Sequence, residues 1–93
     1  MVTNLGTAKE TVICNPKGLH ARPAAKVASL VQTFEADVFI QCNGETAEAN
    51  SIMDLLMLGA EFGTKVIIVA EGHRADEAVS AVSDLIDQGF GEI

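Results

Sequence analysis

Segments with a β-strand pattern alternate with segments that have the 3.6-residue periodicity of a helix, and all of them fit within 93 residues. A β-rich run is followed by an amphipathic run, two β-rich runs, a short amphipathic run, a fourth β-rich run and a last amphipathic run. This order, βαββαβα, predicts an α+β two-layer sandwich. We expect residues 1–93 to form one domain, with the helices packed on one face of the sheet.

The four expected strands are rich in β-branched and aromatic residues and end at turn signals. We place them at Glu10–Cys14, Ala36–Cys42, Glu45–Ala49 and Lys65–Glu71. Asn43 and Gly44 form a strong two-residue hairpin signal, so the second and third strands should pair antiparallel. The fourth strand is the most apolar of the set, which favours a central position in the sheet.

Three further segments carry their apolar residues on one helical face. They are expected to form helices at Ala21–Phe34, Ser51–Leu58 and about Arg74–Gln88. Asn50 and Ser51 are the candidate N-caps of the second helix, and Gly89 is a natural stop for the third. Ile52, Leu55 and Leu56 have helical spacing and should form the apolar face of the short second helix.

The charge balance limits the partners that the chain can bind. The chain has six basic and thirteen acidic residues, for a formal charge of −7. This balance argues against nucleic acid and anionic membranes as partners.

The start of the chain, Met1–Glu10, lacks the apolar region of a signal peptide, and no apolar run approaches the roughly 20 residues of a membrane span. We therefore expect a cytoplasmic protein. Its small size favours a carrier or binding module over an enzyme with a deep pocket.

The soft metal ligands of the chain show no metal-binding spacing. Cys14 and Cys42 lie far apart with no CxxC motif, and only His20 and His73 could join them. We expect two reduced thiols that serve as small packing residues, and neither a metal site nor a cofactor. His73 precedes the last helix and is expected to be an exposed turn residue.

The segment with the clearest chemical potential runs GLHARPA, from Gly18 to Ala24, after the turn signal Asn15-Pro16-Lys17-Gly18. It places His20 at the predicted start of the first helix. The first amides of a helix lack internal partners and carry the positive end of the helix dipole, so a phosphoryl group held there meets donors and favourable charge. His20 is thus a candidate phosphoryl acceptor.

The neighbours of His20 suit this chemistry. Arg22 can direct its planar guanidinium toward phosphate oxygens, Pro23 fits the first turn of a helix, and Gly18 allows close approach of the backbone to the imidazole. These residues taken alone equally fit a surface histidine that acts as an ordinary helix cap.

The GLHARPA segment resembles the active-site segment of the HPr family, the histidine-containing phosphocarriers of the phosphoenolpyruvate-dependent phosphotransferase system. The resemblance covers about Glu10 to Gln88 and includes the Asn-Gly hairpin and the KVIIVAEG strand. It implies an open-faced sandwich with a four-stranded antiparallel sheet and three helices. It also implies that His20 accepts a phosphoryl group on Nδ1 from enzyme I and donates it to an EIIA-type domain, without a metal or cofactor.

The resemblance further implies which residues support His20. Arg22 would stabilise the phosphate charge, and Gly18, Ala21 and Pro23 would support phosphate binding. Many members of the family have Asn or Ser just before the loop glycine, where this chain has Lys17, so a side-chain contact at that position cannot be carried over. Lys17 fits either an additional positive charge or a solvated turn residue.

The second predicted helix carries a candidate regulatory site. Ser51 aligns with the serine that an HPr kinase/phosphorylase modifies in some members, although a helix cap explains this serine as well. Ile52, Met53 and Met57 form an expected partner-docking patch. The run EANSIMDLLML also resembles the nitrogen-related NPr branch, so the sugar-transport and nitrogen-regulatory pathways both stay open.

Two other functions fit the order of elements. The chain could be a regulatory interaction module that acts through the Ser51 region without carrying phosphate, or a small-molecule-binding domain with a ferredoxin-like plan. Neither alternative explains GLHARPA. A carrier whose docking surface is shared in turn by donor and acceptor is expected to be a monomer.

Overall fold

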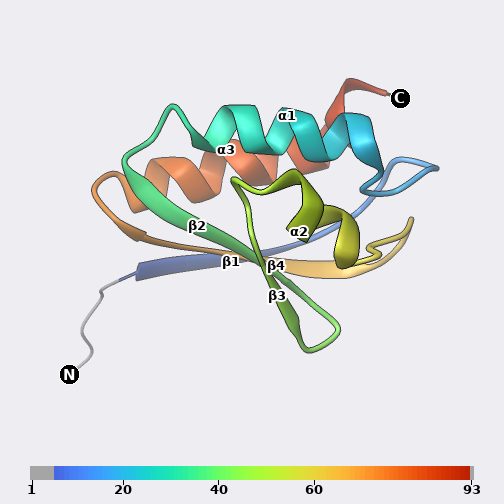
Figure 1. Ribbon diagram of the computed structural model, residues 1–93, viewed down its shortest axis with the longest axis horizontal. Helices are drawn as coiled ribbons and strands as arrows, with labels where there is room; N and C mark the ends of the chain where they lie inside the picture. The colour runs from blue at the N-terminus through green and yellow to red at the C-terminus, as the bar shows by residue number, and fades with distance from the viewer. Residues whose placement is uncertain (1–5, 93) are drawn as a thin grey trace.

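The computed structural model of the chain describes residues 6–92 and shows the predicted order of strands and helices (Figure 1). The strands are β1 (Gly6–Val12), β2 (Ala36–Cys42), β3 (Glu45–Glu48) and β4 (Lys65–Gly72). The helices are α1 (Ala21–Val31), α2 (Ile52–Met57) and α3 (Ala75–Asp87), followed by a 3₁₀ turn, η1 (Gly89–Gly91). The sequence predicted every element except η1.

The four strands form one antiparallel sheet in the order β1-β4-β2-β3, so the most apolar strand is central as expected. Ile68 of β4 pairs with Lys9 on one side and with Ile40 on the other. Side chains alternate between the two faces of β4: Val66 and Ile68 are buried, whereas Lys65 is exposed. The three helices cover one face of the sheet and leave the other open (Figure 1), which confirms the open-faced α+β sandwich.

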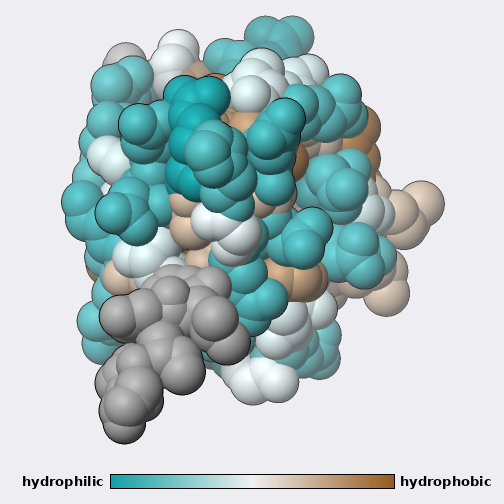
Figure 2. All heavy atoms as spheres, turned by 90° about the vertical axis from the view of Figure 1, so that its left-hand side faces the viewer, coloured by the Kyte–Doolittle hydropathy of each residue, from teal (hydrophilic) through white to brown (hydrophobic). Residues whose placement is uncertain are grey.

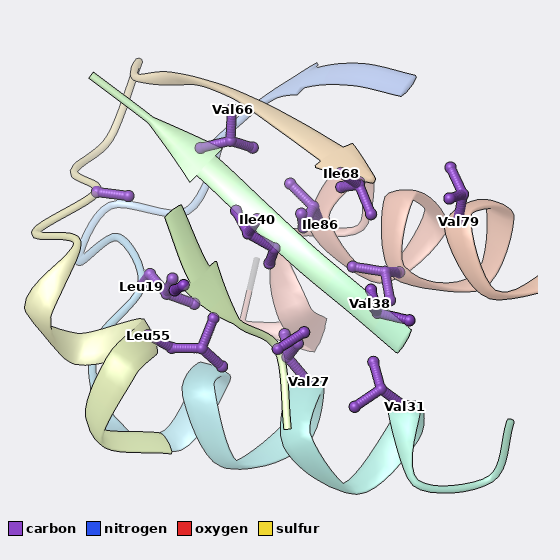
Figure 3. Close-up of a cluster of buried hydrophobic side chains, with 14 of the residues drawn as sticks. Leu19, Val27, Val31, Val38, Ile40, Leu55, Val66, Ile68, Val79 and Ile86 are labelled. Atoms are coloured by element: carbon purple, nitrogen blue, oxygen red, sulfur yellow. The ribbon is translucent and has the colours of Figure 1, made fainter. Parts of the chain in front are cut away.

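The core lies between the sheet and the helices (Figure 3). Val27 and Val31 of α1, Leu55 of α2 and Ile86 of α3 meet the inward side chains of the sheet, among them Ile40. The helical residues come from the apolar faces that the periodicity indicated. Because a small chain has one such core, each helix is held mainly by this contact rather than by its own propensity.

The first strand differs from the prediction, whereas the predicted turn at residues 15–18 is present, since the Gly18 amide donates to the Asn15 carbonyl at 3.1 Å. The sequence placed the strand at Glu10–Cys14, but β1 ends at Val12. Ile13 leaves the sheet because its backbone bonds to the turn before β4: its amide donates to the Thr64 carbonyl at 2.9 Å, and its carbonyl accepts from the Gly63 amide at 2.8 Å. Because of these two bonds, the backbone after Ile13 runs away from the sheet and toward the start of α1.

The first helix is shorter than predicted, because it ends at Val31 rather than at Phe34. Gln32 is the C-cap, and Thr33 donates from both its amide and its hydroxyl to the Leu30 carbonyl, at 3.0 and 2.7 Å. A threonine hydroxyl that binds a backbone carbonyl competes with the helical pattern. Phe34 still packs against the core from the following turn.

Of the three apolar residues that have helical spacing in the second helix, one is buried. Leu55 is fully buried, whereas Ile52 and Leu56 are exposed. The helix has six residues and packs against α1 and β3. Fewer than two turns present a single inward position to these neighbours.

The cysteines and His73 lie where the sequence suggested. Cys42 is buried, and the half-buried Cys14 donates from Sγ to the Ile86 carbonyl at 3.3 Å; both are free thiols. His73 is exposed in the turn before α3. Within residues 6–92, no helix has the length and apolar character that crossing a membrane requires.

The end of the molecule that carries the α1–β2 and β4–α3 connections is covered mainly by hydrophilic side chains (Figure 2). Glu35, Asp37 and Glu71 are among its exposed residues. Arg74 forms an ion pair with Glu77 and lies over the Phe34 ring, 5.1 Å from its centre. The start of α1 lies at the opposite end, beside the C-terminal segment (Figure 1).

Candidate functional site

The turn before α1 is held in shape by a close contact with the segment that follows α2. Gly18 has a φ of +70°, and a Cβ atom there would lie 2.6 Å from the Ala60 carbonyl oxygen and 2.9 Å from the Cα atom of Glu61. The amide of Leu19 donates to the same Ala60 carbonyl at 2.9 Å. Glycine is therefore required here because the turn packs against Ala60 and Glu61, a reason different from the expected approach to the imidazole.

His20 is the N-cap residue of α1, but its side chain makes no capping hydrogen bond. Its backbone is extended, and its carbonyl accepts the Ala24 amide at 3.0 Å. The imidazole is 35% exposed and can thus be reached by a partner protein. The geometry does not support an ordinary capping role for the His20 side chain, which leaves the ring for other chemistry.

The first turn of α1 carries two backbone amides and one guanidinium that could donate hydrogen bonds to an anion. Ala21 and Arg22 occupy helix positions whose N–H groups have no internal partner, and Pro23, which is buried, has no N–H to satisfy. Arg22 is exposed and forms no ion pair with any residue in the described range 6–92. The start of α1 thus presents unpartnered amide donors and the positive end of the helix dipole next to His20.

Glu92, which sequence reasoning missed, is the residue that contacts the His20 ring. Its Oε2 lies 2.9 Å from Nε2 of His20, and its Oε1 accepts from the Asn15 side-chain amide at 2.9 Å. The same Asn15 amide donates to the Gly18 carbonyl at 2.8 Å, and Asn15 is fully buried. His20 and Glu92 are 72 positions apart, and no local signal in the sequence indicated their contact.

The surroundings of Glu92 favour its ionised form. The hydrogen bond from Asn15 lowers the pKa of Glu92 below its usual value, and the hydrogen bond and charge of His20 and the charge of Lys26 act in the same direction, against the effect of partial burial. Glu92 is thus a carboxylate at neutral pH. A negative charge consequently lies at the Nε2 side of the imidazole.

The C-terminal segment is fixed beside α1 by two contacts that place Glu92. Phe90 is completely buried although its φ of +57° is unusual for a bulky residue. Lys26 of α1 donates from Nζ to the Phe90 carbonyl at 2.6 Å. Burial of the ring outweighs the backbone strain, and the turn that results carries Glu92 to the imidazole.

Lys17 is exposed on the turn that precedes His20. Together with Pro16 and Glu92, it lines a shallow depression beside the site. Within residues 6–92, Lys17 forms no ion pair. From this position the positive charge of Lys17 can act on the His20 site at long range.

Ser51 caps α2, as predicted: its Oγ accepts the Asp54 amide at 3.2 Å. Several large apolar side chains of α2 and of the segment after it are exposed, and together we call them the α2 patch. The α2 patch consists of Ile52, Met53, Leu56, Met57 and Phe62. Sequence reasoning found three of these residues and missed Leu56 and Phe62. Because Ala60 follows α2 and bonds to the turn before His20, the α2 patch and the candidate site belong to adjoining segments.

An accessible histidine that begins the first helix of a βαββαβα open-faced sandwich defines the class of histidine phosphocarriers. Residues 7–88 match the family PTS-HPr, described as "PTS HPr component phosphorylation site". The chain therefore belongs to the HPr family of the phosphotransferase system, and the resemblance inferred from GLHARPA is confirmed.

Individual relatives agree with this assignment. The phosphocarrier protein NPr of Escherichia coli K12 is 44% identical over 88 residues, which are 92% of this chain and 98% of the relative. A crystal structure of HPr-C-His from Thermoanaerobacter tengcongensis is 36% identical with a TM-score of 0.89, over 94% of this chain and 98% of that one. A structure from the same organism, described as an HPr dimer, is 38% identical with a TM-score of 0.74, over 88% of this chain and 94% of that one.

Proposed function

We propose that this protein carries a phosphoryl group on His20, accepts it from phospho-enzyme I and passes it to an EIIA-type domain. The observation that carries the proposal is the partly exposed imidazole of His20 at the start of α1, which makes no capping bond and is followed by the two unpartnered amides of Ala21 and Arg22. Membership in the HPr family supports the same role.

The transfer step needs few groups. The lone pair of Nδ1 attacks phosphorus, the N–P bond forms, and the bond between phosphorus and the donor atom of phospho-enzyme I breaks, with its electron pair left on the donor. Charge on the moving group is spread over three oxygens. The amides of Ala21 and Arg22 and the Arg22 guanidinium would oppose this charge, and Gly18 and Pro23 would shape the turn that presents them.

The α2 patch is the proposed docking surface for these partners. Its large exposed apolar side chains are unusual on the surface of a small protein that carries seven net negative charges. Phosphorylation of Ser51 by an HPr kinase/phosphorylase remains a prediction. It would replace a capping hydroxyl with a group of up to two negative charges beside Ile52 and Met53, and would change docking more than folding.

The pathway and the assembly state also remain predictions. The relatives carry the names NPr and HPr, so transfer to a sugar-transport acceptor and transfer to a nitrogen-regulatory acceptor are both compatible with the family. One related HPr structure is described as a dimer. A monomer would expose the His20 site and the α2 patch to donor and acceptor in turn, and sedimentation of the purified protein would test this expectation.

Incubation of the protein with phosphoenolpyruvate and enzyme I is expected to add one phosphate. Because the proposed bond joins phosphorus to nitrogen, the phosphate should be lost in acid and retained in alkali. Native mass spectrometry before and after acid treatment would measure this, and ³¹P NMR would identify the N–P bond. If no phosphate were added, or if it survived acid, the proposed function would be wrong.

Replacement of Arg22 by methionine is expected to slow phosphoryl acceptance about tenfold, the effect of losing one hydrogen bond to a charged group on an exposed surface. The Arg22→Lys variant should recover part of the rate, because lysine keeps the charge but not the planar fork. Rapid-quench measurement of phosphate incorporation would give the rates.

Arg74→Met provides the matched control, since it removes the same guanidinium at the opposite end of the molecule. Its rate of phosphoryl acceptance should equal that of the parent. Equal rates for Arg22→Met and the parent would show that Arg22 takes no part in transfer.

A further inference from the structure

We propose that Glu92, held by the Asn15 amide, is a positioning residue that keeps the proton of His20 on Nε2 and so leaves the Nδ1 lone pair free to attack phosphorus. The proposal rests on the proposed phosphocarrier function and adds a residue to it. Glu92 lies outside the segment that the HPr family matches, residues 7–88. Its role follows from the contacts that it makes in this chain.

The direction of the hydrogen bond between His20 and Glu92 fixes which ring nitrogen holds the proton. A neutral imidazole has one N–H donor and one nitrogen that accepts, and the partner of either nitrogen decides which one holds the proton. A carboxylate can only accept, and Oε2 of Glu92 lies 2.9 Å from Nε2. Nε2 must therefore be the donor, and Nδ1 carries the lone pair.

Glu92 is itself held in place by Asn15. The buried Asn15 amide donates to Oε1 of Glu92 at 2.9 Å and also to the Gly18 carbonyl in the turn that precedes His20. One side chain thus links the carboxylate to the backbone that carries the imidazole. A histidine whose second nitrogen is held by an oriented carboxylate keeps both its tautomer and its ring orientation.

Glu92 would also stabilise the phosphorylated state of His20. When Nδ1 bonds to phosphorus while Nε2 keeps its proton, the ring becomes a positively charged imidazolium. The Glu92 carboxylate faces that charge from the C-terminal segment, and the charged group facing Glu92 from α1 is Lys26. When the phosphoryl group moves on, the N–P electron pair returns to Nδ1 and a neutral imidazole leaves, again with its proton on Nε2.

The tautomer of His20 tests the inference on the unphosphorylated protein. We expect long-range ¹H–¹⁵N NMR at a pH where the ring is neutral to show Nε2 protonated in the parent, and a mixture of both tautomers in Glu92→Gln, whose amide can either donate or accept. Phosphoryl acceptance should slow about 1.5- to fivefold in this variant, the range for loss of an exposed charge pair. Glu92→Ala should show the same mixture without any side-chain partner.

Glu35→Gln is the matched control, because it makes the same chemical change beyond the far end of α1. It should retain the parental tautomer and rate. A pure Nε2–H tautomer in both Glu92 variants, with backbone spectra like that of the parent, would overturn the inference. That result is independent of phosphate uptake, whereas absence of phosphate on the parent would refute the carrier function and leave the tautomer as observed.

Discussion

The His20→Ala variant is expected to lose phosphoryl acceptance completely while remaining folded. Alanine has no nitrogen to bond to phosphorus, and no other histidine lies at the site, since His73 is in the turn before α3. The His20 side chain is outside the hydrophobic core and bonds only to Glu92 within residues 6–92, so the melting temperature should stay near that of the parent. Mass spectrometry after incubation with phosphoenolpyruvate and enzyme I would measure the loss.

His73→Ala is the control for this prediction, because it removes an exposed histidine and should leave one acid-labile phosphate per chain. Undiminished phosphate on His20→Ala would contradict the assignment of His20.

The His20→Gln variant separates a phosphocarrier from a docking module. A module that acts only through the α2 patch would bind its partner as the parent does, whereas phosphoryl transfer requires the imidazole. Titration calorimetry would compare partner binding by the His20→Gln variant with partner binding by the parent.

Replacement of Phe90 by alanine is expected to lower the free energy of unfolding by about 3–5 kcal/mol, the range for truncating a buried phenylalanine. The Phe90 ring is fully buried and is the apolar anchor of η1. Its loss should also release the segment that carries Glu92, so the tautomer of His20 should become mixed as it does in Glu92→Gln. Urea unfolding followed by circular dichroism would measure the stability.

Phe62→Ala makes the same change on the α2 patch, where the ring is 65% exposed. Its free energy of unfolding should stay within about 0.5 kcal/mol of the parental value, as is usual for surface substitutions. Phe62→Ala should instead weaken partner docking. Equal stability losses for the two variants would show that Phe90 does not anchor the C-terminal segment through its burial.

Most of the fold could be predicted because hydrophobic periodicity is a local property. The Asn43-Gly44 hairpin, the central position of Lys65–Glu71 and the cap at Ser51 are each set by adjacent residues, and the structure confirms all three. The ends of elements were less predictable because they depend on distant groups. β1, for example, stops where Ile13 bonds to the turn before β4.

The sequence by itself determined the class of fold and the family, and it singled out the histidine that we propose as phosphoryl acceptor, because strand and helix patterns and the GLHARPA motif lie in contiguous residues. The tertiary structure alone decided what contacts that histidine. It brought Glu92 to Nε2 across 72 positions through the burial of Phe90, showed that Gly18 is required by Ala60, and exposed Leu56 on the α2 patch. These features depend on how separate helices, strands and turns pack together. Packing brings together residues that are far apart in the sequence, so no local pattern predicts them.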